Sequence, residues 1–258
     1  MSAPRPGRLV LVPNTLDFGA RDGAPAITAV LPHGVFEQAA QLTHWVAEDA
    51  KTTRAFLKRV DAVVPLATPL QSIQIRELPR PQKGPRGGAA PADLRDWLEP
   101  AHAGHDLGLM SEAGLPGVAD PGAALVEAAH RAGIDVLPLP GASSLLLAVA
   151  ASGLNGQRFA FVGYLPIDAG ERAARLRELE ARSRREGETQ IVIETPYRNA
   201  ALLAALLQHL AGSTRLSVSC GLTLTTGAFN RSDSIAGWKQ RPREIADDLP
   251  AVYAFLAA

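Results

Sequence analysis

Short apolar runs alternate with amphipathic segments along most of the chain, a pattern typical of an α/β protein. Strand-length apolar runs occur at 8–12, 43–47, 107–110, 134–139, 159–165, 189–194, 215–220 and 251–257, with a further short run, VVPLA, inside 61–75. Helical patterns occur at 34–41, 51–60, 93–102, 123–133, 145–153, 170–185 and 199–210. Strands that alternate with helices predict βαβ units.

The pattern changes near residue 140. Strands and helices alternate before it, whereas the second half is also α/β but carries more strands towards its end. We therefore expect two α/β domains, 8–140 and 141–258, with a cleft between them.

Two strand–loop–helix units contain glycine-rich loops. The first reads LGLMSEAGLPGVADPG, and its Asp120-Pro121 pair predicts a helix N-cap followed by Pro at the first helical position. The second reads PGASS, where Ser143 or Ser144 could cap the next helix or contact a polar ligand. If their strands are parallel neighbours, both loops lie on one rim of a sheet, where ligands bind in open α/β folds. The alternative is an ordinary connection that binds nothing.

Two other segments are rich in Pro and Gly. Residues 13–32 form a long loop after the first strand, and loops of this length are often functional. Residues 76–93, RELPRPQKGPRGGAAPAD, are either a plain disordered loop or a basic flap that touches a polyanion.

Composition excludes several classes of protein. The 258 residues are 47% apolar and carry 26 basic and 26 acidic side chains, so net charge gives no support for broad binding to nucleic acid, although a local basic patch stays open. The single cysteine, Cys220, excludes an intrachain disulfide and makes a cysteine metal cluster implausible. No apolar run reaches membrane-spanning length and the start lacks a signal-peptide core, so we expect a cytoplasmic protein without a membrane partner.

Common catalytic motifs are missing from the sequence. There is no GxxxxGK[ST], no GxGxxG at the first helix, no GxSxG and no HExxH. This disfavours a P-loop NTPase, a standard dinucleotide-binding fold and a serine hydrolase, and it gives no reason to expect a metal.

Four ordered motifs together resemble the tetrapyrrole methylase superfamily. They are AEDxxxTR (47–54), SEAGLPGVADPG (111–122), PLPGASS (138–144), and FxGYLP (161–166) followed by ETPYR (194–198). The resemblance covers about residues 8–257 and is nearest to the small-subunit ribosomal RNA methyltransferase I branch, whose members are cytidine 2′-O-methyltransferases.

The resemblance implies a class III methyltransferase fold in which two α/β domains clasp S-adenosylmethionine, and a homodimer. It also implies a partner in rRNA or the small ribosomal subunit. The positions that match the family's cofactor contacts are Pro13, Ser111, Glu112, Ala113, Gly114, Gly117, Ser143, Ser144, Tyr164, Tyr197, Leu222 and Thr223.

Charged residues near strand ends are candidates for the chemistry of methyl transfer. A ribose hydroxyl acceptor benefits from a general base, and Glu48, Asp49 and Glu194 are the available carboxylates. The alternative for each is a helix cap or an ion-pair partner. The basic residues nearby either bind phosphate or pair with these carboxylates; they are Lys51, Arg54 and Arg198.

Three departures from the family pattern keep other functions open. The loop after the first strand reads PNTLDFGARDGAP, the family's SDAG is SEAG with Glu112, and the late ELTK is Gly221 to Leu224, GLTL. The leading hypothesis is a methyltransferase that acts on small-subunit rRNA. The alternatives are a methyltransferase for a small molecule such as a tetrapyrrole, and a non-catalytic paralogue that binds cofactor or ribosome.

Overall fold

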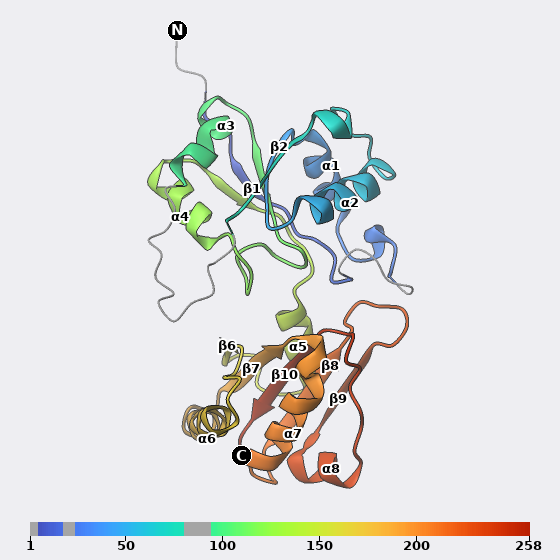
Figure 1. Ribbon diagram of the computed structural model, residues 1–258, viewed down its shortest axis with the longest axis vertical. Helices are drawn as coiled ribbons and strands as arrows, with labels where there is room; N and C mark the ends of the chain where they lie inside the picture. The colour runs from blue at the N-terminus through green and yellow to red at the C-terminus, as the bar shows by residue number, and fades with distance from the viewer. Residues whose placement is uncertain (1–4, 18–23, 80–93) are drawn as a thin grey trace. The chain divides into compact units, whose positions relative to one another are not determined.

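The chain forms two compact units, Met1–Ala142 and Ser143–Ala258, each built on its own five-stranded sheet. The computed structural model describes residues 5–17, 24–79 and 94–258 (Figure 1). Most of the expected basic flap, 80–93, and part of the first long loop, 18–23, lie outside the described residues.

The first unit contains a parallel sheet in the order β3-β2-β4-β1-β5. Its strands are β1 (Leu9–Leu11), β2 (His44–Ala47), β3 (Gln74–Glu77), β4 (Leu107–Met110) and β5 (Val136–Pro138). Its helices are α1 (His33–Gln41), α2 (Ala50–Asp61), α3 (Glu99–His102) and α4 (Ala123–Arg131), with 3₁₀ turns η1 (Ile27–Ala29), η2 (Leu70–Ser72) and η3 (Arg95–Leu98).

Helices cover both faces of this sheet. On one face Val10 and Trp45 pack with Phe36 of α1 and Phe56 of α2. On the other face the strands pack against α4 and the η3–α3 segment, as Figure 1 shows. Both faces are therefore buried, which explains why the central strands read as continuous apolar runs.

The second unit contains a mixed sheet in the order β6-β7-β10-β8-β9, in which β6 and β7 are parallel and the other pairs antiparallel. Its strands are β6 (Phe159–Gly163), β7 (Thr189–Glu194), β8 (Arg215–Cys220), β9 (Phe229–Ser234) and β10 (Ala251–Leu256). Its helices are α5 (Ser144–Ser152), α6 (Ala169–Glu186), α7 (Asn199–His209) and α8 (Ile235–Gln240), with the 3₁₀ turn η4 (Pro196–Arg198).

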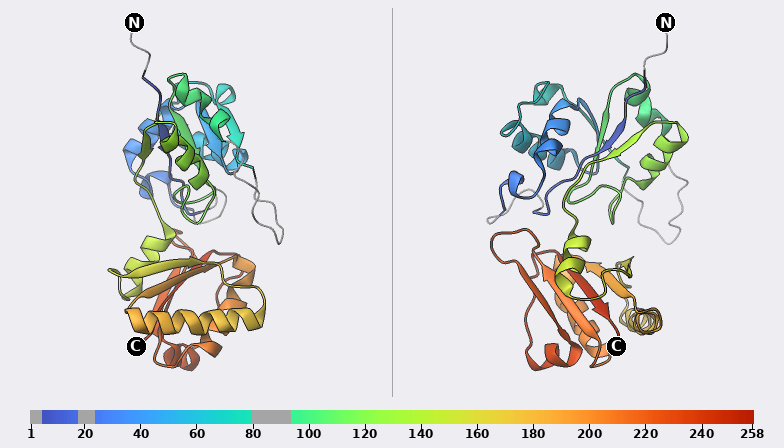
Figure 2. Two further views of the ribbon diagram at one scale, coloured as in Figure 1. Left: turned by 90° about the vertical axis from the view of Figure 1, so that its left-hand side faces the viewer. Right: turned by 180° about the vertical axis from the view of Figure 1, so that it is seen from behind.

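Alternate residues of β10 belong to two different hydrophobic clusters of the second unit, one on each face of the sheet. Tyr253 and Phe255 pack on the side of α6 and α7, whereas Val252 and Ala254 pack on the side of α5. Figure 2 shows α6 as a long helix that lies across this unit. Only one stripe of α6, including Leu176, is buried, as expected for a charged helix with a solvated face.

Several sequence predictions about elements were wrong. The VVPLA run is a loop that contains Pro65 and is followed by Pro69, and the strand of that region is β3, further along at Gln74–Glu77. The helix expected over 93–102 is a 3₁₀ turn followed by the single-turn α3. Strand β9 and helix α8 were not expected at all.

Candidate functional site

The carboxyl ends of the parallel strands gather the sequence motifs of the first unit at one edge of its sheet. Loops after β1, β2, β4 and β5 all leave from this edge. The sequence interpretation took the motif-bearing strands β4 and β5 as neighbours in the sheet. They are not neighbours, because β1 lies between them. Both loops still share an edge, since all these strands run parallel, and ligands of open α/β sheets bind there.

Asn14 joins the loop after β1 to the loop after β4. Its backbone N–H donates to the Gly114 carbonyl at 2.8 Å, and its side-chain Nδ2 donates to the Glu112 carbonyl at 2.7 Å. Asn14 is buried and its Oδ1 also accepts from the Thr15 N–H. The shape of the SEAG loop therefore depends on a residue that the sequence interpretation did not single out, although it directly follows the first strand and Pro13.

The loop after β5 packs directly on the loop after β1. A Cβ placed on Gly141 would lie 2.2 Å from Cβ of Pro13 and 2.5 Å from its Cγ. Such a contact is too short for any side chain, so glycine is required where these two loops meet. The PGASS loop and the first-strand loop therefore meet where Gly141 faces the Pro13 ring.

Helix α2 fixes the far part of the first loop. Arg59 Nη2 lies 3.1 Å from Asp17 Oδ2, and Thr15 Oγ1 donates to Asp17 Oδ1 at 2.7 Å. The Asp17 side chain is almost fully buried, so this ion pair is well shielded from water. Neither residue was singled out from the sequence, because the pairing joins positions 42 residues apart.

An acidic cluster lies at the same edge. Glu48 Oε2 accepts a hydrogen bond from the Glu112 N–H at 3.1 Å. Burial, together with the charges of Glu48 and Glu112, raises the pKa of Asp120 to about 7. The prediction that Asp120 caps α4 was wrong, because the helix begins only at Ala123 and its N-cap is Gly122, with φ 136°. Asp120 is therefore part of the edge rather than of the helix.

Ser111 directly follows β4, and its hydroxyl has no hydrogen-bond partner among the described residues. The residue is only 2% exposed, and within the described part of the chain its Oγ finds neither donor nor acceptor. A buried polar atom without a partner costs free energy, so a ligand at this edge would gain by bonding it. The same loop holds Ala119 at φ 66°, an unusual conformation for a residue with a side chain.

The remaining expected residues of the first unit are placed as follows. Asp49 accepts from the Thr52 N–H at 2.6 Å and is the N-cap of α2, which agrees with the helix-cap alternative. Lys51 and Arg54 are exposed on the first turns of α2. Ala113 and Gly117 lie in the loop after β4.

In the second unit, β6, β7 and β8 also end at a common edge, because β10 is antiparallel to both β7 and β8. Tyr164 follows β6 and Tyr197 follows β7, and both side chains are exposed. Leu222 packs against the α5 side of the sheet. Thr223 has φ 72°, and its buried Oγ1 has no partner among the described residues, which repeats the situation of Ser111 and Ala119.

Glu194 forms a buried ion pair. Its Oε2 lies 2.7 Å from Arg198 Nη2, and its Oε1 accepts from the Thr195 N–H at 2.8 Å. The Glu194 side chain is only 2% exposed. This geometry agrees with the ion-pair alternative for both residues.

Ser143 is the N-cap of α5, where its hydroxyl accepts from the Leu146 N–H, and Ser144 is the first residue of that helix. The expectation that one of these serines caps the helix is therefore confirmed, whereas contact with a ligand stays a prediction.

Across residues 5–17, 24–79 and 94–258, no group of three or more His, Cys, Asp or Glu side chains is placed to hold a metal ion. None of the helices described is long and apolar enough to span a bilayer.

Comparisons with known proteins were made for the sequence and for the fold. Residues 39–228 match the family model described as Tetrapyrrole (Corrin/Porphyrin) Methylases. Ribosomal RNA small subunit methyltransferase I of Bacillus subtilis (strain 168) is 34% identical over 194 residues, which are 74% of this chain and 59% of that protein. The protein of the same name from Mesorhizobium japonicum is 41% identical over 122 residues, 47% of this chain and 40% of its own.

The chain spans about half the length of the curated relatives it matches. Among solved structures, the crystal structure of the methyltransferase CobJ aligns with a TM-score of 0.53 and 17% identity, covering 98% of this chain and 95% of that one. This likeness confirms the α/β fold with two sheets that the sequence predicted.

Proposed function

The chain belongs to the tetrapyrrole methylase family, and we propose that it is an S-adenosylmethionine-dependent methyltransferase whose acceptor is small-subunit rRNA, at the ribose 2′-oxygen of a cytidine. The observation that carries the acceptor is the relation to ribosomal RNA small subunit methyltransferases I at 34–41% identity. The family description favours a corrin or porphyrin as the second candidate acceptor.

The carboxyl edge of the first sheet fits this cofactor chemically. Bound S-adenosylmethionine supplies a methyl group activated by a cationic sulfonium. The acidic cluster of Glu48, Glu112 and Asp120 complements that positive charge. The buried Ser111 hydroxyl supplies an unused donor and acceptor beside the cluster. We assign the cofactor to these residues, with the SEAG loop held in shape by Asn14.

Transfer to a hydroxyl requires a proton acceptor. As the acceptor oxygen bonds to the methyl carbon and the carbon–sulfur bond breaks, the hydroxyl proton must pass to a base. Glu48 remains the best placed of the three expected carboxylates, because Asp49 caps α2 and Glu194 is paired with Arg198. Asp120 joins it, since a carboxyl with a pKa of about 7 is half ionised at neutral pH and so is well matched to accept a proton.

The remaining implied properties belong to the same proposal. We assign Lys51 and Arg54 to binding of acceptor phosphates, because both are exposed and lie close in sequence to Glu48 and Asp49. We infer the homodimer from the family resemblance, and the cytoplasmic location from the lack of an apolar run of membrane-spanning length. Sedimentation equilibrium tests the first, and cell fractionation tests the second.

Methyl transfer from tritiated S-adenosylmethionine tests the acceptor. The purified protein is incubated with small ribosomal subunits that lack the cytidine modification, with fully modified subunits as the matched control, and with a porphyrin precursor as a third acceptor. We expect label in the unmodified rRNA alone. Label in the porphyrin would support the second candidate, and cofactor binding without transfer to either acceptor would support the non-catalytic paralogue.

A further inference from the structure

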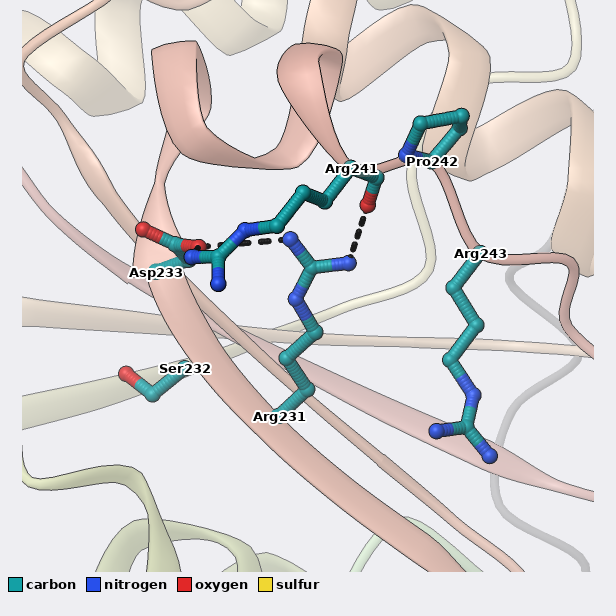
Figure 3. A pocket seen from close by; sticks show the side chains of 6 residues that line it. All are labelled: Arg231, Ser232, Asp233, Arg241, Pro242 and Arg243. Carbon is teal, nitrogen blue, oxygen red and sulfur yellow. Dashed lines mark hydrogen bonds and ion pairs between the residues drawn. The ribbon is translucent and has the colours of Figure 1, made fainter.

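Three arginines line a surface cavity of the second unit that none of the candidate site residues shares. The cavity has a volume of about 610 Å³. We call it the β9 arginine pocket, and Figure 3 shows its lining residues, which are Arg231, Ser232, Asp233, Arg241, Pro242 and Arg243. They come from β9 and from the segment that follows α8. Strand β9 is at the edge of its sheet.

The Arg231 side chain is held in place by several contacts within the pocket. Its guanidinium carbon lies 4.1 Å from the ring centroid of Trp238, a fully buried residue whose Nε1 donates to the Leu216 carbonyl. Arg231 also donates to the Arg241 and Gly237 carbonyls and to Asp233 Oδ2. These contacts use most of its donors, so Arg231 mainly builds the site and orients Asp233.

Asp233 is shared between two guanidinium groups. Its Oδ2 accepts from Arg231 at 3.2 Å and from Arg241 at 2.8 Å, as the dashed lines of Figure 3 indicate for the residues drawn. Hydrogen bonds from Arg231, the Ser234 N–H and Arg241 hold the pKa of Asp233 below its usual value, so the carboxylate stays ionised. One carboxylate against three arginines leaves the pocket with two positive charges, in a chain whose net charge is zero.

The two arginines that give the pocket its positive charge, Arg241 and Arg243, are exposed to solvent. The Arg241 side chain is 77% exposed, and Arg243 is exposed on the other side of the pocket. The Arg243 guanidinium stacks on the Phe229 ring, 4.2 Å from its centroid, so its plane is partly ordered before anything binds. Planar guanidinium forks match the paired oxygens of a phosphate, and pre-ordering lowers the entropy lost on binding.

We propose that the β9 arginine pocket binds backbone phosphates of the RNA acceptor. This rests on the proposed function for the identity of the acceptor. The pocket is larger than one phosphate group needs and carries its exposed arginines on two sides, which suits two phosphates of a continuous strand. Because β9 is the last strand of its sheet, we expect the RNA strand to continue past the pocket on this side.

Salt-dependent binding of rRNA tests the pocket. The double variant Arg241→Gln/Arg243→Gln removes both exposed charges, and Arg243→Gln alone leaves the Asp233 pairs intact. The matched control is Arg177→Gln/Arg185→Gln, which removes two exposed arginines of α6 in the same unit. Binding of protein-free small-subunit rRNA and of whole subunits is measured by filter retention at several salt concentrations, and cofactor affinity by calorimetry.

We expect the double variant to lower the slope of log affinity against log salt by about 1.5, because each lost phosphate contact removes about 0.7–0.9. At low salt the RNA affinity of the double variant should fall about tenfold or more, and the single variant should show roughly half of the change in slope. The RNA binding of the control should equal that of the unchanged protein. The affinity for cofactor should be unchanged in every variant.

An RNA affinity and slope equal to those of the control would overturn the proposal. Weaker binding to whole subunits with unchanged binding to free rRNA would also overturn it, because the pocket would then contact a ribosomal protein. If the unchanged protein binds rRNA through these arginines but transfers no methyl group, the proposed function fails while the pocket stands.

Discussion

The unusual acidity of Asp120 predicts how the stability of the first unit depends on pH. The substitution is Asp120→Asn, which keeps the size of the side chain and removes its charge. In the folded chain the pKa of Asp120 is raised, so the folded state binds more protons than the unfolded state between about pH 4 and pH 7. The free energy of unfolding therefore falls as pH rises through that window, and the variant escapes this loss.

The size of the effect follows from the difference between the pKa of Asp120 in the folded chain and that of an unperturbed aspartate. The pKa of Asp120 is about 7 in the folded chain, against 3.8 for an unperturbed aspartate. A tenfold change in acidity is worth about 1.4 kcal/mol, which sets an upper limit of about 4 kcal/mol. Because Asp120 is only partly buried, solvent screening reduces this, and we expect Asp120→Asn to be more stable by about 1–2 kcal/mol at about pH 8. Less than half of that gain should be present at about pH 5.

Urea unfolding followed by circular dichroism at several pH values measures the difference between the variant and the unchanged chain. Asp96→Asn, at an exposed acid of the same unit, is the matched control and should show no such growth with pH. A gain for Asp120→Asn that stays constant from about pH 5 to pH 8, or a loss, would refute the assignment of Asp120 to the acidic cluster.

Three further substitutions test the site. Ser111→Ala should leave stability nearly unchanged, because the hydroxyl has no partner among the described residues, but should weaken cofactor affinity about two- to tenfold; equal affinity would remove Ser111 from the site. Arg198→Met leaves the buried Glu194 carboxylate unpaired and should cost about 3 kcal/mol in urea unfolding, whereas a loss below about 1 kcal/mol would mean that the pair is unimportant. Gly141→Ala should destabilise the first unit by about 1–3 kcal/mol through its clash with Pro13, and adding Pro13→Gly should restore part of that loss; no rescue would place the strain elsewhere.

Apolar strands could be predicted from the sequence, including β5 and β6 at sheet edges, whereas the polar edge strands β3 and β9 could not. The predicted bounds of β7 and β8 coincide with those observed, because both are apolar runs in the middle of a sheet. Strands β3 and β9 lie at sheet edges and read QIRE and FNRSDS, so neither produces an apolar run. Their positions follow from pairing with β2 and β8, which only the fold supplies.

In the candidate site, local features could be predicted from the sequence, whereas contacts between distant positions could not. The glycine-rich loops and Ser111 could be found from local patterns and the family resemblance. Contacts such as Asn14 to Glu112 join residues 98 positions apart and depend on the order of the strands. Asp120 was misassigned because Asp-Pro before an apolar run is a common helix start, whereas here the neighbouring Glu48 and Glu112 place it in a cluster of charges.

Calorimetric titration of the whole chain with S-adenosylmethionine tests most directly whether this family member has kept the cofactor chemistry assigned to its glycine-rich edge. We predict saturable binding that weakens in Ser111→Ala and persists in Arg177→Gln/Arg185→Gln. No heat of binding at millimolar cofactor, from protein whose circular dichroism shows it folded, would contradict the methyltransferase assignment.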